Sequence, residues 1–297
     1  MTEFLCHVGF DGISYSFSKR NLSDLSVLSN YSTSSQYASI TTDNIYLYLS
    51  DSGYHKIEKR LASDFSLVAE IGSPGTGNDQ FNQPQGITTD DTYLYICDSG
   101  NNRIVKRLCS DLSYADQIGS SGSGLDQFSA PQGIATDGTY LYICDVSNNR
   151  IMKRLCSDLS YVDHIGTAGS GNDQFNSPTD VCLDNTFLYI CDNGNYRVVK
   201  RQQIDLSYVD QIGSLGTGND QFNSAYSIAT DNTYLYIGDQ TFQDPGGNHR
   251  IVKRLCSDLS YVSKTTDPNI QIYGLGYFNS SSPPMSPSSL NFGSIIW

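Results

Sequence analysis

The stretch that decides the fold runs from Gln80 to Arg107 and reads QFNQPQGITTDDTYLYICDSGNNRIVKR. It returns almost unchanged at 127–154 and 174–201, and looser copies begin near residues 36 and 221. A fixed period of this length is the signature of a repeat architecture, so the repeat must be interpreted before any single motif. One aspartate marks the period, at intervals of 47 residues: Asp51, Asp98, Asp145, Asp192 and Asp239.

Each copy contains four short segments with the character of β-strands. In the quoted copy, Pro84–Thr89 is apolar and β-branched, and Tyr93–Cys97 has its side chains alternating at period two. Arg103–Leu108 and Ser113–Ile118 complete the set, and polar turns separate the four. Strands of about five residues joined by such turns predict an antiparallel meander. No segment of the copy has helical periodicity.

Apolar residues point to both faces of this small sheet, so one copy has to stack on its neighbours. Four-stranded units of about 40–50 residues that stack radially are the blades of a β-propeller. An open β-solenoid is the alternative, and it would favour shorter repeats with a cap at each end. The sequence therefore predicts an all-β fold, a β-propeller built from four-stranded antiparallel blades.

The two ends of the chain supply one further blade between them. Residues 4–30 align with the last three strands of a copy, and the strand-like piece at 269–278 can supply the missing first strand. Five whole copies and one shared blade predict a ring of six, and closure removes the exposed sheet edges of an open array. We expect one domain over residues 1–278, followed by a Ser/Pro-rich tail at 279–297 that is typical of an extended linker.

Three recurring strings resemble the NHL repeat: P-x-G-I-x-x-D, Y-L-Y-I-C-D-S-G-N-N-R-I and G-S-x-G-x-G-x-x-Q-F. The similarity spans residues 4–278, and it rests on several fixed spacings that recur together. NHL domains are typically six-bladed propellers, so the resemblance implies the same blade count. The chain departs from the family in the Asn-Asp pair before Gln-Phe, where Asp-Gly is usual, and in the Lys-Arg pair that closes the third strand.

The composition argues against several classes of function. The net charge of −13 is opposite to the clustered positive field that binds phosphate backbones, so we expect no nucleic-acid partner. No apolar run is long enough to cross a bilayer, and Met1–Phe10 lacks the features of a signal peptide. Six of the eight cysteines occupy positions that other copies fill with residues such as Leu, Ala or Ser. Such packing positions favour reduced thiols and a reducing, cytoplasmic compartment, while a virion or surface location stays open.

The repeated aspartates invite two interpretations. The Asp90 and Asp98 series could ring an axial channel and hold a cation, because calcium sites use several carboxylates and carbonyls. Both series fall at hairpin turns, where aspartate bonds its own backbone, so we favour a structural role. A metal-dependent hydrolase or lyase would need residues that break the repeat symmetry. The four histidines share no strand position and glutamate is rare, so we expect no catalytic residue, no metal site and no cofactor.

Residues that deviate from the repeat are the best indication of function, since folding explains the repeated ones. The turn after Asp239 is enlarged, the turn at Tyr54-His55-Lys56 is a variant, and the apolar C-terminus holds the single tryptophan. Both turns should lie at one end of the ring. We predict that a partner is bound by Thr241, Phe242, Gln243, Asp244, His249, Tyr54, His55 and Trp297, with Phe242 as the apolar anchor.

The leading hypothesis is a non-catalytic interaction scaffold, a rigid propeller that presents loops from one face to a protein partner. The second is a structural subunit of a larger surface or virion assembly, suggested by a composition rich in Tyr, Ser, Asn and Asp and poor in Lys and Glu. A metal-dependent propeller enzyme is the third. Self-assembly and a small-molecule ligand also remain open.

Overall fold

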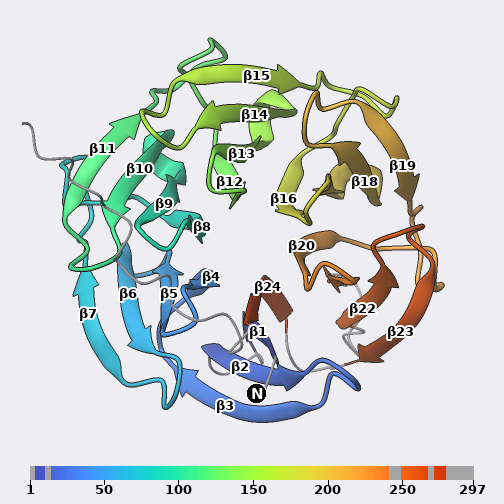
Figure 1. Cartoon of the computed structure of the whole chain (residues 1–297), viewed down its shortest axis with the longest axis horizontal. Helices are drawn as coiled ribbons and strands as arrows, with labels where there is room; N and C mark the ends of the chain where they lie inside the picture. Colours follow the sequence, from blue (N-terminus) through green and yellow to red (C-terminus); the bar gives the residue numbers. More distant parts are fainter. Residues whose placement is uncertain (1–3, 11–14, 241–248, 267–270, 279–297) are drawn as a thin grey trace, which may run out of the picture.

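The computed structural model describes residues 4–10, 15–240, 249–266 and 271–278. Within these ranges the chain forms six four-stranded sheets, each an antiparallel meander, set around a common axis (Figure 1). The predicted all-β, six-bladed propeller is therefore confirmed.

Five blades are formed by consecutive strands that follow one another from the axis outward (Figure 1). The first of these comprises β4 (Tyr37–Thr42), β5 (Tyr46–Asp51), β6 (Lys56–Leu61) and β7 (Leu67–Ile71). The next comprises β8 (Pro84–Thr89), β9 (Tyr93–Asp98), β10 (Arg103–Leu108) and β11 (Tyr114–Ile118). It is followed by β12 (Pro131–Thr136), β13 (Tyr140–Asp145), β14 (Arg150–Leu155) and β15 (Tyr161–Ile165). The last two comprise β16 (Pro178–Leu183), β17 (Phe187–Asp192), β18 (Arg197–Gln202) and β19 (Tyr208–Ile212), and then β20 (Ala225–Thr230), β21 (Tyr234–Asp239), β22 (Arg250–Leu255) and β23 (Tyr261–Thr266).

The sixth blade is shared between the two ends of the chain, as predicted. Its strands are β1 (Phe4–Phe10), β2 (Tyr15–Asn21) and β3 (Val27–Thr33), with β24 (Gln271–Phe278) as the innermost. β24 pairs antiparallel with β1, so that Phe278 lies opposite Phe4. The innermost strands of the six blades contact one another in a closed circle that ends where it began, at β4. The tail predicted at 279–297 lies outside the described residues.

Three 3-10 helices form the turns after the second strands of the middle blades: η1 (Ser99–Asn101), η2 (Val146–Asn148) and η3 (Asn193–Asn195). No helix formed by the described residues has the length and hydropathy of a membrane span.

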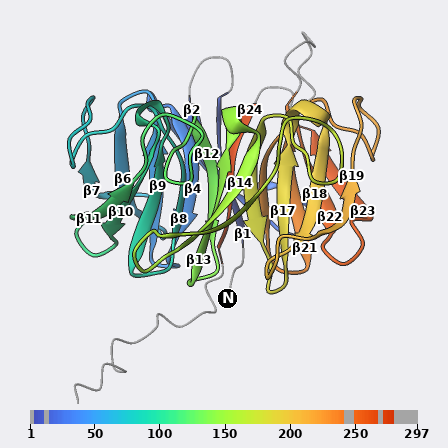
Figure 2. The same ribbon diagram turned by 90° about the horizontal axis from the view of Figure 1, so that it is seen from above.

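Figure 2 shows the ring from the side, with its two ends. We call one the linker end, because the linkers between blades lie there together with the η turns. The other, which carries the turns between first and second strands, is the hairpin end.

The core is divided among the joints between blades. Along β9, Leu94 and Ile96 pack into the cluster shared with the preceding blade. Tyr95 and Cys97 point the other way, into the cluster shared with the following blade. Because alternate side chains of a strand face opposite sides of the sheet, each second strand is buried on both faces. No blade has a core of its own, so each blade requires its neighbours.

All eight cysteines are buried thiols, and none is bonded to another cysteine. This agrees with the packing role predicted from their substitution by other residues. Burial raises the pKa of the Cys97, Cys144, Cys182 and Cys191 thiols well above the ordinary value. These side chains therefore remain protonated and act as small apolar groups.

A buried lysine on the third strand of each of the five consecutive blades ties that blade to the next. The Lys106 ammonium donates to the carbonyls of Cys156 (2.7 Å) and Ser157 (3.0 Å) in the following blade. It also lies 4.0 Å from the centre of the Tyr93 ring, within the range of a cation–π contact. The same clasp recurs at other joints through Lys59, Lys153, Lys200 and Lys253.

The last of these clasps closes the ring. The Lys253 ammonium donates to the carbonyl of Leu22, 2.7 Å away, in the blade that the two chain ends share. The joint between the end and the beginning of the chain therefore uses the same contact as the joints between consecutive copies. The Lys-Arg pair departs from the NHL pattern, and this contact between blades explains its lysine.

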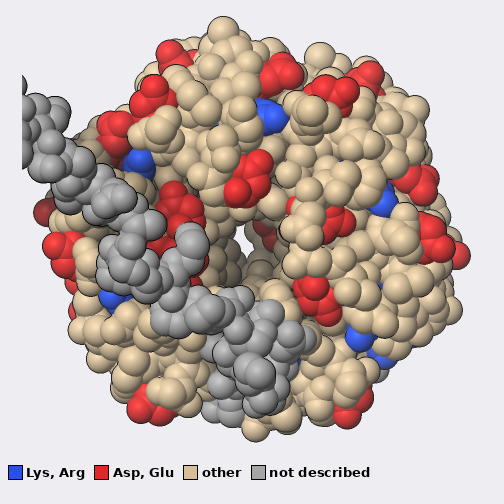
Figure 3. All heavy atoms as spheres, viewed as in Figure 1, with Lys and Arg blue, Asp and Glu red and all other residues tan. Residues whose placement is uncertain are grey.

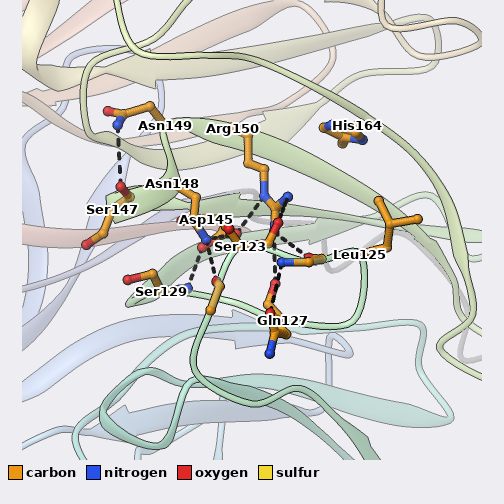
Figure 4. Close-up of polar contacts among 12 residues, drawn as sticks. Ser123, Leu125, Gln127, Ser129, Asp145, Ser147, Asn148, Asn149, Arg150 and His164 are labelled. Atoms are coloured by element: carbon orange, nitrogen blue, oxygen red, sulfur yellow. Dashed lines mark hydrogen bonds and ion pairs between the residues drawn. The ribbon is translucent and has the colours of Figure 1, made fainter.

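An aspartate–arginine pair fastens each glycine-rich linker to its blade, as Figure 4 shows for one blade. The Asp145 carboxylate accepts hydrogen bonds from Arg150 Nε and Asn148 Nδ2, both at 2.8 Å, and from the Ser129 backbone N–H at 2.7 Å. The Arg150 guanidinium in turn donates to linker carbonyls, among them that of Ser123 at 2.8 Å. The pair is buried and bonded on every side, which offsets the loss of hydration of both charges.

In the four copies that follow a glycine-rich linker, the second arginine holds the other half of that linker. Arg107 donates to the Asn78 carbonyl (2.6 Å) and pairs with the Asp79 carboxylate (2.6 Å). This contact accounts for the aspartate before Gln-Phe, a position where NHL repeats usually have glycine; the residue before it contributes only its backbone carbonyl, which Leu125 supplies in the next linker. Linker glycines are needed because the backbone turns sharply there: Gly119 has φ +126°, and a Cβ on it would lie 2.7 Å from the Asn102 carbonyl oxygen.

We expect Lys106→Met to lower the free energy of unfolding by about 1–3 kcal/mol, because it removes a charged donor from two buried carbonyls. The measurement is urea unfolding followed by circular dichroism. Lys264→Met is the matched control, since Lys264 is exposed, and its effect should stay within about 0.5 kcal/mol. Equal unfolding midpoints for the two variants would show that the clasp does not stabilise the ring.

Candidate functional site

Five of the eight residues predicted to bind a partner lie outside the described part of the chain: Thr241, Phe242, Gln243, Asp244 and Trp297. The other three lie at the linker end, as expected from their position in the repeat. Tyr54 is 54% exposed, whereas His249 is only 6% exposed. The part that these residues play in binding stays a prediction.

His55 has a structural contact of its own. It adopts a left-handed backbone conformation (φ 58°), and its Nδ1 accepts a hydrogen bond of 3.0 Å from the Gln83 backbone N–H. The equivalent residue of the next copy, Asn102, accepts the same bond through its Oδ1 from the Ala130 N–H at 2.9 Å. Asn149 repeats the contact one blade further on. The imidazole therefore replaces an asparagine amide in a contact with the chain that enters the next blade.

The variant turn at Tyr54-His55-Lys56 changes the aspartate–arginine pair of its blade. Where Arg103 bonds Asp98 in the next copy, Lys56 reaches instead to Glu58 and Glu70, both at 2.8 Å. Among the described residues, the buried Asp51 Oδ2 has no hydrogen-bond partner. This blade also follows the short Ser-rich joint rather than a glycine-rich linker, so the contacts that an arginine would make there are missing as well.

Both repeated aspartate series have the structural role that the sequence predicted. Asp90 Oδ1 accepts the backbone N–H groups of Thr92 and Tyr93, and its Oδ2 accepts the Tyr95 hydroxyl at 2.7 Å. The Asp98 series does more than bond its own turn, since it pairs with arginine and fastens the linker. Among the described residues, no group of three or more His, Cys, Asp or Glu side chains is placed to hold a metal ion.

The axial channel is where the repeat symmetry breaks. The six innermost strands line it, and one level of its wall consists of Ala38, Gln85, Gln132, Thr179, Tyr226 and Tyr273. The residues that follow these are small in five blades (Ser39, Gly86, Gly133, Ser227 and Gly274). In the remaining blade this position is Asp180. A carboxylate thus enters a narrow ring in which other blades carry glycine or serine.

Asp180 is held by backbone donors. Its Oδ1 accepts the N–H of Val181 and its Oδ2 that of Ile228 on the neighbouring strand β20, both at 2.9 Å. Burial raises the pKa of this carboxyl to about 7, although the two N–H donors oppose the shift. The glycine in the preceding blade is required by this close packing, because a Cβ on Gly133 would lie 2.4 Å from the Asp180 Cα.

Two cavities flank this level of the channel. The one at the linker end has a volume of about 200 Å³ and is lined by Tyr226, Tyr273 and Gln85 among others. The one at the hairpin end, of about 180 Å³, includes Asp180 in its lining. The Tyr226 and Tyr273 rings meet edge to face, with centroids 6.5 Å apart. Burial, together with the nearby Asp180 charge, raises the pKa of the Tyr226 hydroxyl.

Asp180 was not among the residues predicted from the sequence, because it is neither a histidine nor a glutamate nor one of the aspartates that recur in phase. The signal was present in the first strand of the copy, where Pro178-Thr179-Asp180 stands in place of the Pro-Gln-Gly of the two preceding copies. Its importance depends on knowing that this position faces the axis. That information comes from the closed ring and not from the repeat alone.

The charges are segregated between the interior and the surface. Fifteen of the eighteen lysines and arginines are buried, which leaves Lys264 as the one exposed cation among residues with described side chains. Many carboxylates are exposed, and Figure 3 shows them distributed around one end of the ring. The exposed set comprises Asp24, Asp64, Glu70, Asp79, Asp91, Asp111, Asp116, Asp126, Asp137, Asp158, Asp163, Asp173, Asp205, Asp210, Asp220 and Asp258.

The raised pKa of Asp180 predicts a pH-dependent stability. In the unfolded chain an aspartate ionises near pH 4, so folding becomes less favourable as the pH rises from about 4 to about 7, where the folded carboxyl also ionises. We expect Asp180→Asn to gain about 2–3 kcal/mol of stability relative to the wild type between pH 5 and pH 8. Thermal unfolding across this range is the measurement. Exposed Asp163→Asn is the control, and parallel pH profiles for wild type and Asp180→Asn would contradict the assignment.

Comparisons with known proteins support the fold and not a family. No protein-family model matches the chain, and no curated protein matches its sequence. The crystal structure of a nidogen/laminin complex contains a chain similar to this one, with a TM-score of 0.73 and 14% identity over 94% of this chain and 99% of that one. A protein of unknown function from Bacteroides caccae has a TM-score of 0.66, with the same identity and coverage. The chain is therefore a six-bladed β-propeller by fold, and its membership of the NHL family is not shown.

Proposed function

We propose that this propeller is a non-catalytic interaction scaffold that binds a protein partner with a basic surface. The observation that carries the proposal is the segregation of charge: nearly every cation is buried in the framework, and the exposed charges are almost all carboxylates. Such a surface attracts positively charged partners over the Debye length and accelerates their encounter. It also repels nucleic acids.

The framework suits a scaffold because its repeated contacts leave little to be ordered on binding. Lysine clasps join the blades, and the aspartate–arginine pairs hold the linkers against them. A partner that meets a preorganised surface loses less binding free energy to conformational entropy. One structurally similar chain comes from a complex of two proteins, nidogen and laminin, which supports a protein as the partner class.

We place the contact at the linker end, because the deviations from the repeat gather there. The enlarged turn begins after Asp239 at this end, and the exposed Tyr54 lies in the variant turn at the same end. Aromatic residues on turns held by a rigid framework are common binding anchors. Phe242, in the part of the turn outside the described residues, remains the proposed apolar anchor.

Replacing residues 241–247 with a single glycine should abolish capture of the partner, because it removes the proposed anchor. The thermal unfolding temperature should change little, since the clasps and linkers are untouched. The measurement is affinity capture from the source cells by immobilised wild type and variant, followed by titration of the purified captured protein. The triple variant Asp116→Asn, Asp163→Asn and Asp210→Asn on the outer strands is the control; it should still capture the partner, with an affinity only a few-fold lower through the reduced long-range attraction.

Two results would contradict this proposal. Undiminished binding by the shortened variant would show that the linker-end turn is not the contact. An affinity that does not change between low and high salt would show that the acidic surface does not attract the partner. A captured protein whose binding is lost in the shortened variant and weakened by salt would support both parts.

A second candidate function, a subunit of a larger assembly, is favoured by an apolar patch on the outer rim. Exposed apolar side chains lie on two edge strands of adjacent blades: Val27, Leu28 and Tyr31 on β3, and Leu67 and Val68 on β7. The Arg60 guanidinium lies 5.0 Å from the Tyr31 ring centre and bridges these blades. Edge strands with apolar faces are sites where further chains add.

If this patch joins subunits, the paired substitution Leu28→Lys and Val68→Lys should convert an oligomer into a monomer. Sedimentation velocity of wild type and variant provides the measurement. Val209→Lys on β19, an exposed apolar residue on the rim of a different blade, is the control and should leave the oligomer intact. A wild-type protein that sediments as a monomer at all concentrations would rule out assembly by self-association.

A further inference from the structure

We propose that the axial channel is a binding site for a small organic cation, a protonated amine whose charged group meets Asp180 and whose apolar body packs against Tyr226 and Tyr273. The proposal does not rest on the scaffold function, because its residues line the channel and not the outer surface. It would stand if no protein partner bound the ring.

The charge of the ligand follows from what surrounds Asp180. Among the described residues that line the channel cavities, Asp180 is the one charged side chain. Each of its oxygens accepts one backbone N–H, which leaves a lone pair on each for a further donor. An ammonium group would supply both the missing positive charge and these donors. A single carboxylate suits a monovalent cation, whereas calcium is held by several oxygen ligands that include carboxylates.

The shape of the ligand follows from the asymmetry of the channel wall. Tyr226 and Tyr273 come from the adjacent strands β20 and β24 and form an aromatic half. Gln85 and Gln132 come from β8 and β12, which lie across the axis from them (Figure 1), and form an amide half. Aromatic faces beside a carboxylate attract organic ammonium groups by cation–π interaction. The cavity of about 200 Å³ next to the tyrosines has room for a body the size of a single aromatic ring.

The architecture of the ring does not require a carboxylate at this place. Gly86 and Gly133 occupy the same position in the two preceding blades, and Ser39 and Ser227 occupy it in two others. Asp180 is only partly exposed, and a charge with reduced access to water lowers stability unless a partner compensates it. An aspartate in a position that the fold fills elsewhere with glycine is therefore best explained by a ligand that contacts it.

The binding should depend on pH, because only the ionised carboxylate attracts an ammonium. The titratable groups that feel the Asp180 charge are the Tyr226 hydroxyl and the thiols of Cys97, Cys144, Cys182 and Cys191; burial raises the pKa of each, and the Asp180 charge raises it further. All of these are neutral below pH 8. The affinity for an amine that stays protonated should therefore fall between pH 8 and pH 6 through the titration of Asp180 alone.

Benzylammonium is a suitable probe, since it joins a primary ammonium to one aromatic ring. We expect the wild-type protein to bind it at pH 8 with a dissociation constant in the millimolar range or tighter, measured by calorimetry and by ligand-observed NMR. Benzyl alcohol, its neutral counterpart, should bind about tenfold more weakly. Asp180→Asn should lower the affinity for benzylammonium about tenfold and should remove the preference for it over benzyl alcohol.

The aromatic wall is tested separately. Tyr226→Phe keeps the ring and should retain affinity within about threefold, whereas Tyr226→Ala should weaken binding about fivefold or more. Asp163→Asn, on the outer surface, is the control for a general loss of negative charge and should bind as the wild type does. Thermal unfolding of each variant establishes that the ring is folded. If Asp180→Asn does not fold, the fall in wild-type affinity between pH 8 and pH 6 tests the role of the carboxylate instead.

Several results would overturn the proposal. No binding of benzylammonium by the wild type up to about 20 mM would show that the channel does not take such a cation. Equal affinities for benzylammonium and benzyl alcohol, or an unchanged affinity in Asp180→Asn, would show that the carboxylate does not recognise charge. Displacement of benzylammonium by micromolar calcium would assign the site to a metal ion.

Discussion

The ring depends on lysines buried between blades. Each clasp takes an ammonium group out of water and places it against at least one carbonyl of the next blade and the face of an aromatic ring. Lys106 has two such carbonyls, those of Cys156 and Ser157, and the Tyr93 ring. The loss of hydration offsets much of the free energy that these contacts supply, since burial lowers the pKa of Lys153 and Lys253. The clasp contributes mainly to specificity. The ammonium group can bond the neighbouring turn in only one arrangement, so each blade fixes the position of the next.

The burial of cations inside the framework determines the charge of the surface. Most lysines and arginines lie inside the framework, where they join blades and hold linkers, so the exposed charges of the described residues are mostly carboxylates. Linkers illustrate the coupling, since a buried arginine binds an exposed linker aspartate from within at four places: Arg107 with Asp79, Arg154 with Asp126, Arg201 with Asp173 and Arg254 with Asp220. Architecture and long-range electrostatics are therefore two consequences of one distribution of charge.

Repetition also separates residues that build the ring from residues that are free for function. Substitutions within the repeat can still be structural, as His55 shows by accepting the backbone bond that Asn102 accepts in the next copy. Asp180 differs, because no contact elsewhere in the ring calls for a carboxylate at its position. A departure from a repeat indicates function only when the structural role of its equivalents has been identified.

The amino-acid sequence determined the strands, the six blades, the shared blade and the structural role of the aspartates, because the copies repeat one local pattern and alternating side chains require neighbours on both faces. The tertiary structure alone decided where the charges lie, since Lys106 meets carbonyls 50 residues away. It also decided which residues line the channel, because Asp180, Tyr226 and Tyr273 come together only when strands from different blades converge on the axis. Spacing along a chain specifies a repeated unit, whereas a site at the centre of a ring exists only after the ring has closed.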